Sequence, residues 1–106
     1  MVIVGGRGTG ILTTVMQQQL GEVYPCPAGL NGVHVFAEDR AFVVGERGYA
    51  ASMDINDGSI VEWPSITLDV LHATFVDSTG LVYAVGGNLF TADQYFHGII
   101  MRTQVE

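Results

Sequence analysis

The chain has 106 residues, which suits one domain over residues 1–106. Hydrophobic residues make up 48% and charged residues 14%, a composition that supplies a core and excludes a disordered chain. The formal net charge of -7 excludes nucleic acid and anionic membrane surfaces as partners. No charged leader with an apolar stretch, and no apolar run of membrane-spanning length, occurs. We therefore expect a soluble protein, cytoplasmic by default, with its location otherwise open.

Short runs rich in Val, Ile, Phe and Tyr follow one another along the chain, each bounded by Gly, Asp, Asn or Ser. This pattern predicts short strands joined by tight turns. The strands are expected at 2–4, 11–15, 22–24, 33–37, 41–44, 49–53, 59–63, 71–76, 82–85 and 98–102. Helix-compatible residues occur only over 13–20, which we interpret as an extension of one strand and a polar loop.

Two sequence units recur along the chain. Val4-Gly5 returns as Val44-Gly45 after forty residues and as Val85-Gly86 after forty-one more. The unit 30–39 also resembles 68–77, with matching Leu, His and Asp positions thirty-eight apart. This second alignment predicts an insertion of three residues in the turn 78–80.

Four short antiparallel strands in about forty residues are typical of a β-propeller blade. The strands fall in the order b-c-d, a-b-c-d and a-b-c. The sequence therefore predicts an all-β fold, a β-propeller fragment of about two and a half four-stranded antiparallel blades. The repeats cover about 1–29 (partial), 30–67 (full) and 68–106 (partial).

The full repeat resembles the photosystem II assembly/stability factor repeat and the wider group of sialidase-type BNR repeats. The resemblance rests on turn and core residues: Asp39, Val44-Gly45, Gly48, Ser52-x-Asp54, Asp57-Gly58 and Trp63. The stretch from Ser52 to Trp63 is similar to an Asp-box with a longer gap before the tryptophan. The other repeats lack this tryptophan, and Tyr24 is expected to replace it in the first. The resemblance implies a fold and no particular substrate.

A propeller ring needs at least four blades, because each blade covers the faces of its two neighbours. A fragment of this size leaves two apolar sheet faces and several strand edges in water. We therefore expect a homo-oligomer, a dimer or trimer, that closes a ring. The alternative is that the chain is one piece of a longer propeller.

His34 and His72 fall at matching positions on the innermost strands in the second alignment. Such histidines can form a metal or anion site around the channel, or hydrogen-bond a neighbouring blade as structural residues. We expect the structural role, and no metal or cofactor. Cys26, the single cysteine, is expected to be a small buried residue, since no intrachain disulfide is available.

Other candidate binding residues lie in turns and loops. Arg7 and Arg47 precede matching glycines and can bind a carboxylate, or can simply be exposed turn residues. Tyr95, Phe96 and His97 form an aromatic loop suited to a sugar or a protein, and equally to an oligomer interface. The loop 54–58 is expected to be a side-chain-stabilised turn rather than a calcium site, and 5–10 a blade turn rather than a phosphate loop.

No catalytic set of nucleophile, base and acid stands out in the sequence. The expected function is a non-enzymatic binding or scaffold module that self-assembles into a ring, with a protein or carbohydrate as a further ligand. Two alternatives remain: a glycan-binding lectin built of repeated pockets, for which Trp63 is a candidate residue, and a fragment of a sialidase- or glycosidase-type propeller.

Overall fold

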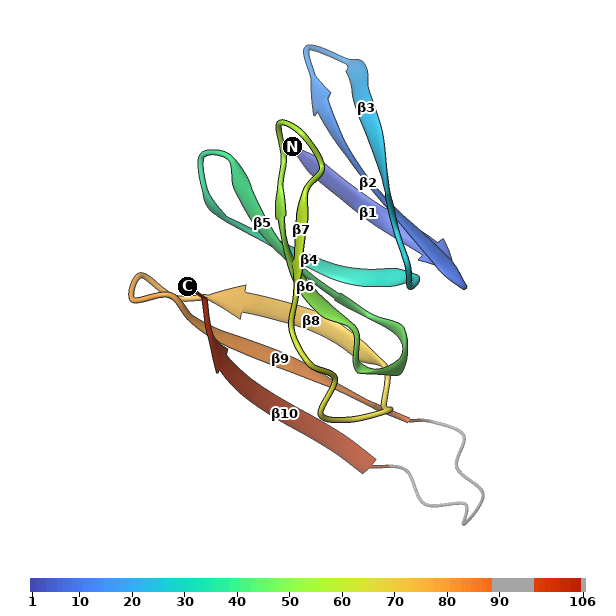
Figure 1. Cartoon of the computed structure of the whole chain (residues 1–106), viewed down its shortest axis with the longest axis vertical. Helices are drawn as coiled ribbons and strands as arrows, with labels where there is room; N and C mark the ends of the chain where they lie inside the picture. Colours follow the sequence, from blue (N-terminus) through green and yellow to red (C-terminus); the bar gives the residue numbers. More distant parts are fainter. Residues whose placement is uncertain (89–96, 106) are drawn as a thin grey trace.

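The computed structural model describes residues 1–88 and 97–105, and the expected all-β fold is confirmed (Figure 1). The strands are β1 Val2–Arg7, β2 Thr9–Met16, β3 Gln19–Cys26, β4 Leu30–Ala37, β5 Arg40–Gly45, β6 Ala50–Asp54, β7 Ile60–Glu62, β8 Leu71–Val76, β9 Leu81–Asn88 and β10 His97–Gln104. The one helical element of the described part is a 3-10 turn, Glu46–Gly48. No helix there is long and apolar enough to cross a membrane.

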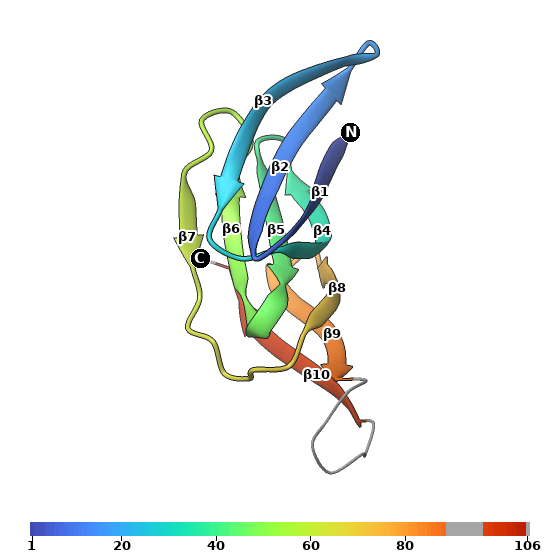
Figure 2. The same ribbon diagram turned by 90° about the vertical axis from the view of Figure 1, so that its right-hand side faces the viewer.

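The strands form three antiparallel sheets, with β1-β2-β3 in the first, β4-β5-β6-β7 in the second and β8-β9-β10 in the third. Every expected run overlaps one of these strands, in the expected grouping of three, four and three. The sheets follow one another in sequence order, as the two views in Figures 1 and 2 show. The expected two and a half blades came from dividing ten strands by four. The ten strands instead form three separate sheets, two of which have three strands.

Hairpin turns explain the local sequence between strands. The segment 13–20 continues β2 to Met16 and then turns through Gln17 and Gln18, both with positive φ, as expected for a strand extension and a polar loop. After β6, Asp54 Oδ1 accepts a hydrogen bond from Asn56 N at 2.8 Å, which closes the turn that the sequence predicted. Asp57 Oδ1 likewise accepts from Ser59 N at 2.8 Å.

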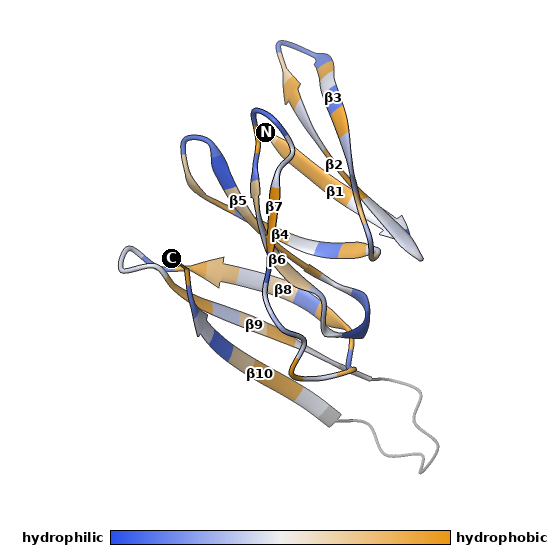
Figure 3. Ribbon diagram, in the orientation of Figure 1, coloured by the Kyte–Doolittle hydropathy of each residue, from blue (hydrophilic) through white to orange (hydrophobic). Residues whose placement is uncertain are grey.

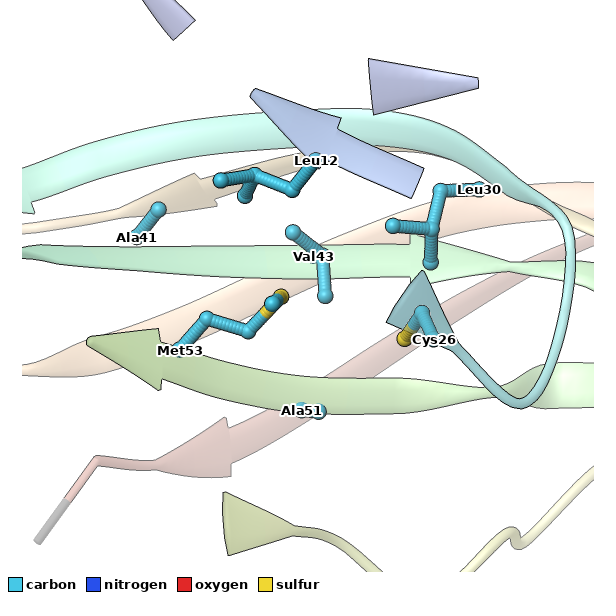
Figure 4. Packing of buried hydrophobic residues seen from close by; sticks show 7 residues of the cluster. All are labelled: Leu12, Cys26, Leu30, Ala41, Val43, Ala51 and Met53. Carbon is cyan, nitrogen blue, oxygen red and sulfur yellow. The ribbon is translucent and has the colours of Figure 1, made fainter. Parts of the chain in front are cut away.

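Side chains alternate between the two faces of the middle sheet, and an outer sheet packs on each face. One face joins the first sheet in a core of Leu12, Cys26, Leu30, Ala41, Val43, Ala51 and Met53 (Figure 4). The other face joins the third sheet in a core of Phe42, Val44, Ala50, Leu71, Val76, Val82 and Ala84. Each outer sheet therefore buries only the face that it turns to the middle sheet.

The strand register corrects the second sequence alignment. Leu30 pairs with Gly45 and Leu71 pairs with Gly86, and a bulge follows each pair. The offset between these strands of the second and third sheets is therefore forty-one residues, and the expected insertion at 78–80 is wrong. The identical Leu, His and Asp residues at an offset of thirty-eight positions are therefore a coincidence. The register is set by how β4 and β8 pair with β5 and β9, the strands that contain the Val-Gly motif.

The recurring Val-Gly motif has a steric cause in the second and third sheets. A Cβ on Gly45 would overlap the carbonyl oxygen of Gly29, and a Cβ on Gly86 would overlap that of Val70. In each case the peptide that leads into the first strand of the sheet crosses over the glycine. At Gly5, the matching position in the first sheet, a Cβ would meet nothing within 4 Å. No strand precedes β1 in that sheet.

Candidate functional site

A pocket of about 270 Å³ opens beside the 3-10 turn, where the segment between β3 and β4 meets the segment after β7. Its walls combine aromatic, charged and hydroxyl side chains. They are Pro27, Ala28, Glu46, Arg47, Tyr49, Glu62, Trp63 and Ser65. The pocket therefore brings together two residues that the sequence proposed separately, Arg47 and Trp63.

Glu46 holds one wall of the pocket together. Its Oε2 atom accepts hydrogen bonds from Gly8 N at 2.9 Å and from Gly29 N at 3.2 Å. Gly8 lies in the β1–β2 turn and Gly29 just before β4, so one carboxylate ties the first sheet to the second. A carboxylate that accepts two backbone N–H groups is a strong, charge-assisted contact.

Tyr49 contributes the unusual polar group of this pocket. Its Oη atom is buried, and it lies within hydrogen-bonding reach of the Cys26 thiol and the Glu62 carboxylate. Burial raises the pKa of this hydroxyl well above its usual range, and the neighbouring Cys26 and Glu62 act in the same direction.

Arg47 and Trp63 form the outer part of the pocket. Arg47 is exposed and has a φ of 53°, a left-handed conformation that costs energy for a residue other than glycine. Its carbonyl oxygen accepts a hydrogen bond from Ser65 Oγ at 3.0 Å. Trp63 is half-buried and packs edge-on against Phe42, with ring centroids 5.4 Å apart. Its position is therefore fixed by the core while part of it stays accessible.

Tyr24 replaces Trp63 in the first sheet, as the sequence predicted. Tyr24 pairs with Leu12, and Trp63 N donates to the carbonyl of Ala50, which occupies the matching place in the second sheet. Each aromatic ring packs into the core that its sheet shares with the next one. Tyr24 Oη donates to the Asn56 carbonyl at 2.7 Å.

His34 joins the second sheet to the third. Its Nδ1 atom accepts a hydrogen bond from Val76 N at 2.8 Å, and its ring stacks on Phe75 with centroids 4.8 Å apart. This is the contact with a neighbouring sheet that the structural interpretation of His34 predicted.

His72 does not occupy the position that matches His34, which corrects the expectation of a recurring histidine. With the offset of forty-one residues, His34 corresponds to Phe75, and His72 corresponds to Asn31. His72 is exposed at the bulge of β8. The described residues contain no cluster of His, Cys, Asp or Glu that could hold a metal ion.

The remaining candidates fall at two places. Arg7 is exposed at the end of β1 and lies at the same end of the molecule as Arg47, since Gly8 N bonds to Glu46. Arg7 does not line the pocket. Tyr95 and Phe96 lie outside the described residues, and the side chain of His97 does too, although its backbone begins β10.

A second candidate surface is the outer face of each terminal sheet (Figure 3). Three exposed apolar side chains lie on one face of the first sheet, because Ile3 and Val23 both pair with Thr13 and Ile11 pairs with Gly5. Four large side chains are exposed on the third: Phe75, Tyr83, Val85 and Ile100. Apolar side chains gathered on an open sheet face mark an interaction surface.

A larger hollow, of about 450 Å³, lies where the first hairpin meets the turns of the second sheet. It is lined by Met1, Val2, Thr14, Met16, Val35, Glu38, Ile55 and Asn56. Glu38 is the one charged side chain among these residues. The pocket beside the 3-10 turn has three, Glu46, Arg47 and Glu62.

Comparisons with protein families, with curated proteins and with solved structures find no match to this chain.

Sequence reasoning singled out two of the eight residues that line the pocket, and Glu46, Tyr49 and Glu62 are among the six that it missed. The motif containing Glu46 was interpreted as a turn, and its carboxylate has a role only because Gly8 and Gly29 approach it from other elements. Tyr49 was expected to be an ordinary residue of the strand 49–53. No local pattern marks the contacts of its hydroxyl with Cys26 and Glu62, which come from other strands.

Proposed function

We propose that this protein is a non-enzymatic β-propeller module whose chains assemble head to tail into a closed ring. One observation carries this proposal. Apolar side chains that are buried in the middle sheet have exposed counterparts at the corresponding positions of the two outer sheets. The partner that fits these faces is a second copy of the chain. Additional repeats of a longer chain and an unrelated protein are the competing occupants.

The third sheet exposes residues that the middle sheet buries. The pairs Val44–Ala50 and Val85–Ile100 occupy matching places in the two sheets. Val44 and Ala50 are 0% and 5% exposed, whereas Val85 and Ile100 are 42% and 77% exposed. Phe42, 1% exposed, corresponds to Tyr83, 38% exposed. In the middle sheet this face is covered by the third sheet. A further sheet of the same kind would cover the corresponding face of the third sheet.

The first sheet exposes the complementary face. Ile3 corresponds to Val43 through the Val-Gly motif, and the exposed fraction is 43% for Ile3 and 0% for Val43. Val43 is covered because a preceding sheet packs on it. The outer faces of the third and first sheets thus correspond to the two sides of an interface that the chain already makes twice internally. Two different faces in contact form a heterologous, ring-forming interface.

The number of sheets favours a dimer over a trimer. Two chains with three sheets each give a ring of six, and three chains give nine. Propellers have about four to eight blades, so six falls within this range and nine outside it. Gly5 supports the same arrangement, since its open side has room for the peptide that crosses Gly45 and Gly86 in the other sheets.

The test is the solution mass of the purified chain by light scattering at several concentrations. We expect a species with twice the 11.4 kDa mass of one chain. The variant Ile100→Asp places a charge on the proposed interface and should yield monomers, because burying an unpaired carboxylate is strongly unfavourable. A wild-type protein that stays monomeric at all concentrations contradicts the proposal.

Leu68→Asp is the matched control. Leu68 is 79% exposed, close to the 77% of Ile100, but it lies in the segment between β7 and β8 and on no strand of the two outer sheets. This variant should assemble like the wild type. If both variants assemble, the outer face of the third sheet is not the interface. If both are monomeric, the loss of assembly follows from added charge alone.

A further inference from the structure

We propose that the free edge of β1 binds an extended segment of another polypeptide chain, which becomes a fourth strand of the first sheet. The segment that fits this edge has the residue pattern of β4, the strand at the corresponding edge of the second sheet. The binding site is a strand edge, whereas the ring interface consists of the outer faces of the sheets. The two proposals can therefore fail independently of one another.

One edge of β1 carries backbone groups that face no other strand. Met1 N donates to the carbonyl of Val15 at 3.3 Å, and the carbonyl of Met1 accepts from Val15 N at 2.8 Å, so Met1 turns toward β2. Because this direction alternates along an antiparallel strand, the N–H and C=O groups of Val2, Val4 and Gly6 turn away from β2. Within the described part of the chain, β2 is the one strand that pairs with β1. An open edge of this kind binds extended peptides by adding a strand.

The corresponding edges of the second and third sheets are occupied by β4 and β8. The peptide that leads into each of these strands crosses closely over Gly45 or Gly86. Gly5 has the matching position in the first sheet, and a Cβ added there would meet nothing within 4 Å. The first sheet therefore has open space where the other two sheets hold the start of a further strand.

β4 offers a hydrogen-bond donor to a strand placed beside β1. In the neighbouring pair of sheets, Val76 N of β8 donates out of its own sheet to His34 Nδ1 of β4 at 2.8 Å. Val35 of β4 is the counterpart of Val76, forty-one positions earlier, and it is 43% exposed. A histidine at the matching place of the added strand would accept the same bond from Val35 N. This contact favours an occupant that repeats the sequence of β4 over other extended segments.

The pairing of β4 with β5 gives the register of the added strand. The residue in the place of Gly32 lies opposite Val4 of β1, and the residue in the place of His34 lies opposite Val2. A small residue is needed opposite Val4, because a Cβ on Gly32 would lie 2.9 Å from the Cα of Ala73 in the next sheet. Both β4 and β8 begin with a buried leucine two positions before the small residue. The pattern that fits the edge is therefore Leu-x-Gly-x-His.

The test adds a fluorescein-labelled peptide with the sequence of residues 29–38 to the full chain and follows the anisotropy of the label. We expect saturable binding, and slower amide exchange by NMR at Val2, Val4 and Gly6 in the complex. The same titration with Ile100→Asp, the variant expected to be monomeric, separates strand addition from ring assembly. Absence of saturable binding, equal binding of a scrambled peptide, or slower exchange only in other strands overturns the proposal.

Two N-methylated forms of this peptide are a matched pair. In β4 the N–H groups of Gly32 and His34 turn toward the paired strand. Those of Val33 and Val35 turn away from it, as the bond from Val76 N to His34 shows for the matching strand. Methylation at Gly32 and His34 should weaken binding about tenfold or more, because two hydrogen bonds are lost. Methylation at Val33 should leave the affinity unchanged, and equal losses in the two peptides overturn the proposal.

Discussion

Cys26 and Tyr49 place two ionisable groups side by side in the interior between the first and second sheets. Burial raises the pKa of the Cys26 thiol, and it raises the pKa of Tyr49 as well. Cys26 itself is 3% exposed, as the sequence interpretation of a small buried residue expected. Both groups are therefore held in the neutral form in the folded protein, while the unfolded chain releases their protons at ordinary pH values.

This difference predicts that the protein becomes less stable as the pH rises. Above about pH 8.5, the ordinary pKa of a thiol, the unfolded chain binds fewer protons than the folded one, so the free energy of unfolding falls with pH. Urea denaturation between pH 7 and 10 measures this slope. Cys26→Ala should make it shallower between about pH 8.5 and 10. An unchanged slope in this variant would contradict the assignment to Cys26.

The Val-Gly strand is the element that organises each sheet. In the second sheet, Glu46 N donates to the carbonyl of Gly29 at 3.0 Å, and in the third sheet Gly87 N donates to that of Val70 at 2.9 Å. A glycine at position 45 or 86 lets these peptides approach closely enough for the bond. The repeat seen in the sequence is therefore a repeated backbone crossing.

Gly45→Ala should destabilise the protein by about 3 kcal/mol or more, because its Cβ would overlap a backbone oxygen that cannot move without breaking the crossing. Gly5→Ala is the matched control, since a Cβ there meets nothing within 4 Å. We expect no loss of stability from this second change in the monomer. Denaturant unfolding of both variants checks the prediction, and equal losses would contradict the steric explanation.

At the scale of the whole molecule, the apolar outer faces favour association of two chains and the strongly negative net charge disfavours it. The net charge of -7 makes two chains repel, whereas the proposed interface is built of side chains such as Ile3, Val85 and Ile100. Repulsion between exposed charges is screened by salt, and apolar contact is not weakened by it. The ionic strength should therefore control how tightly the chains associate.

Raising NaCl from about 50 to 500 mM should strengthen dimerisation severalfold, because the Debye length falls from above 10 Å to below it. Sedimentation equilibrium at several protein concentrations measures the dissociation constant. Weaker association at high salt would mean that ion pairs, rather than the apolar faces, hold the chains together. The variant Ile100→Asp should remain monomeric at both salt concentrations.

The sequence by itself determined the strands, their grouping and the places of the turns, because these depend on local patterns: alternating apolar residues, glycines and Asx turns. It also identified Tyr24 as the counterpart of Trp63. The prediction that His34 and His72 occupy matching positions was wrong, since identical residues thirty-eight positions apart carry no information about strand pairing.

Only the tertiary structure decided which residues meet in the pocket. Arg47 and Trp63 come from different elements of the second sheet, and the pairing of β6 with β7 brings them together with their chain neighbours Glu46, Tyr49 and Glu62. Pro27 and Ala28 reach the same pocket from the segment between β3 and β4. The buried hydroxyl of Tyr49 meets Cys26 from the first sheet, so its surroundings are also a product of packing. No one-dimensional pattern contains those surroundings, because they arise only when the first and second sheets pack together.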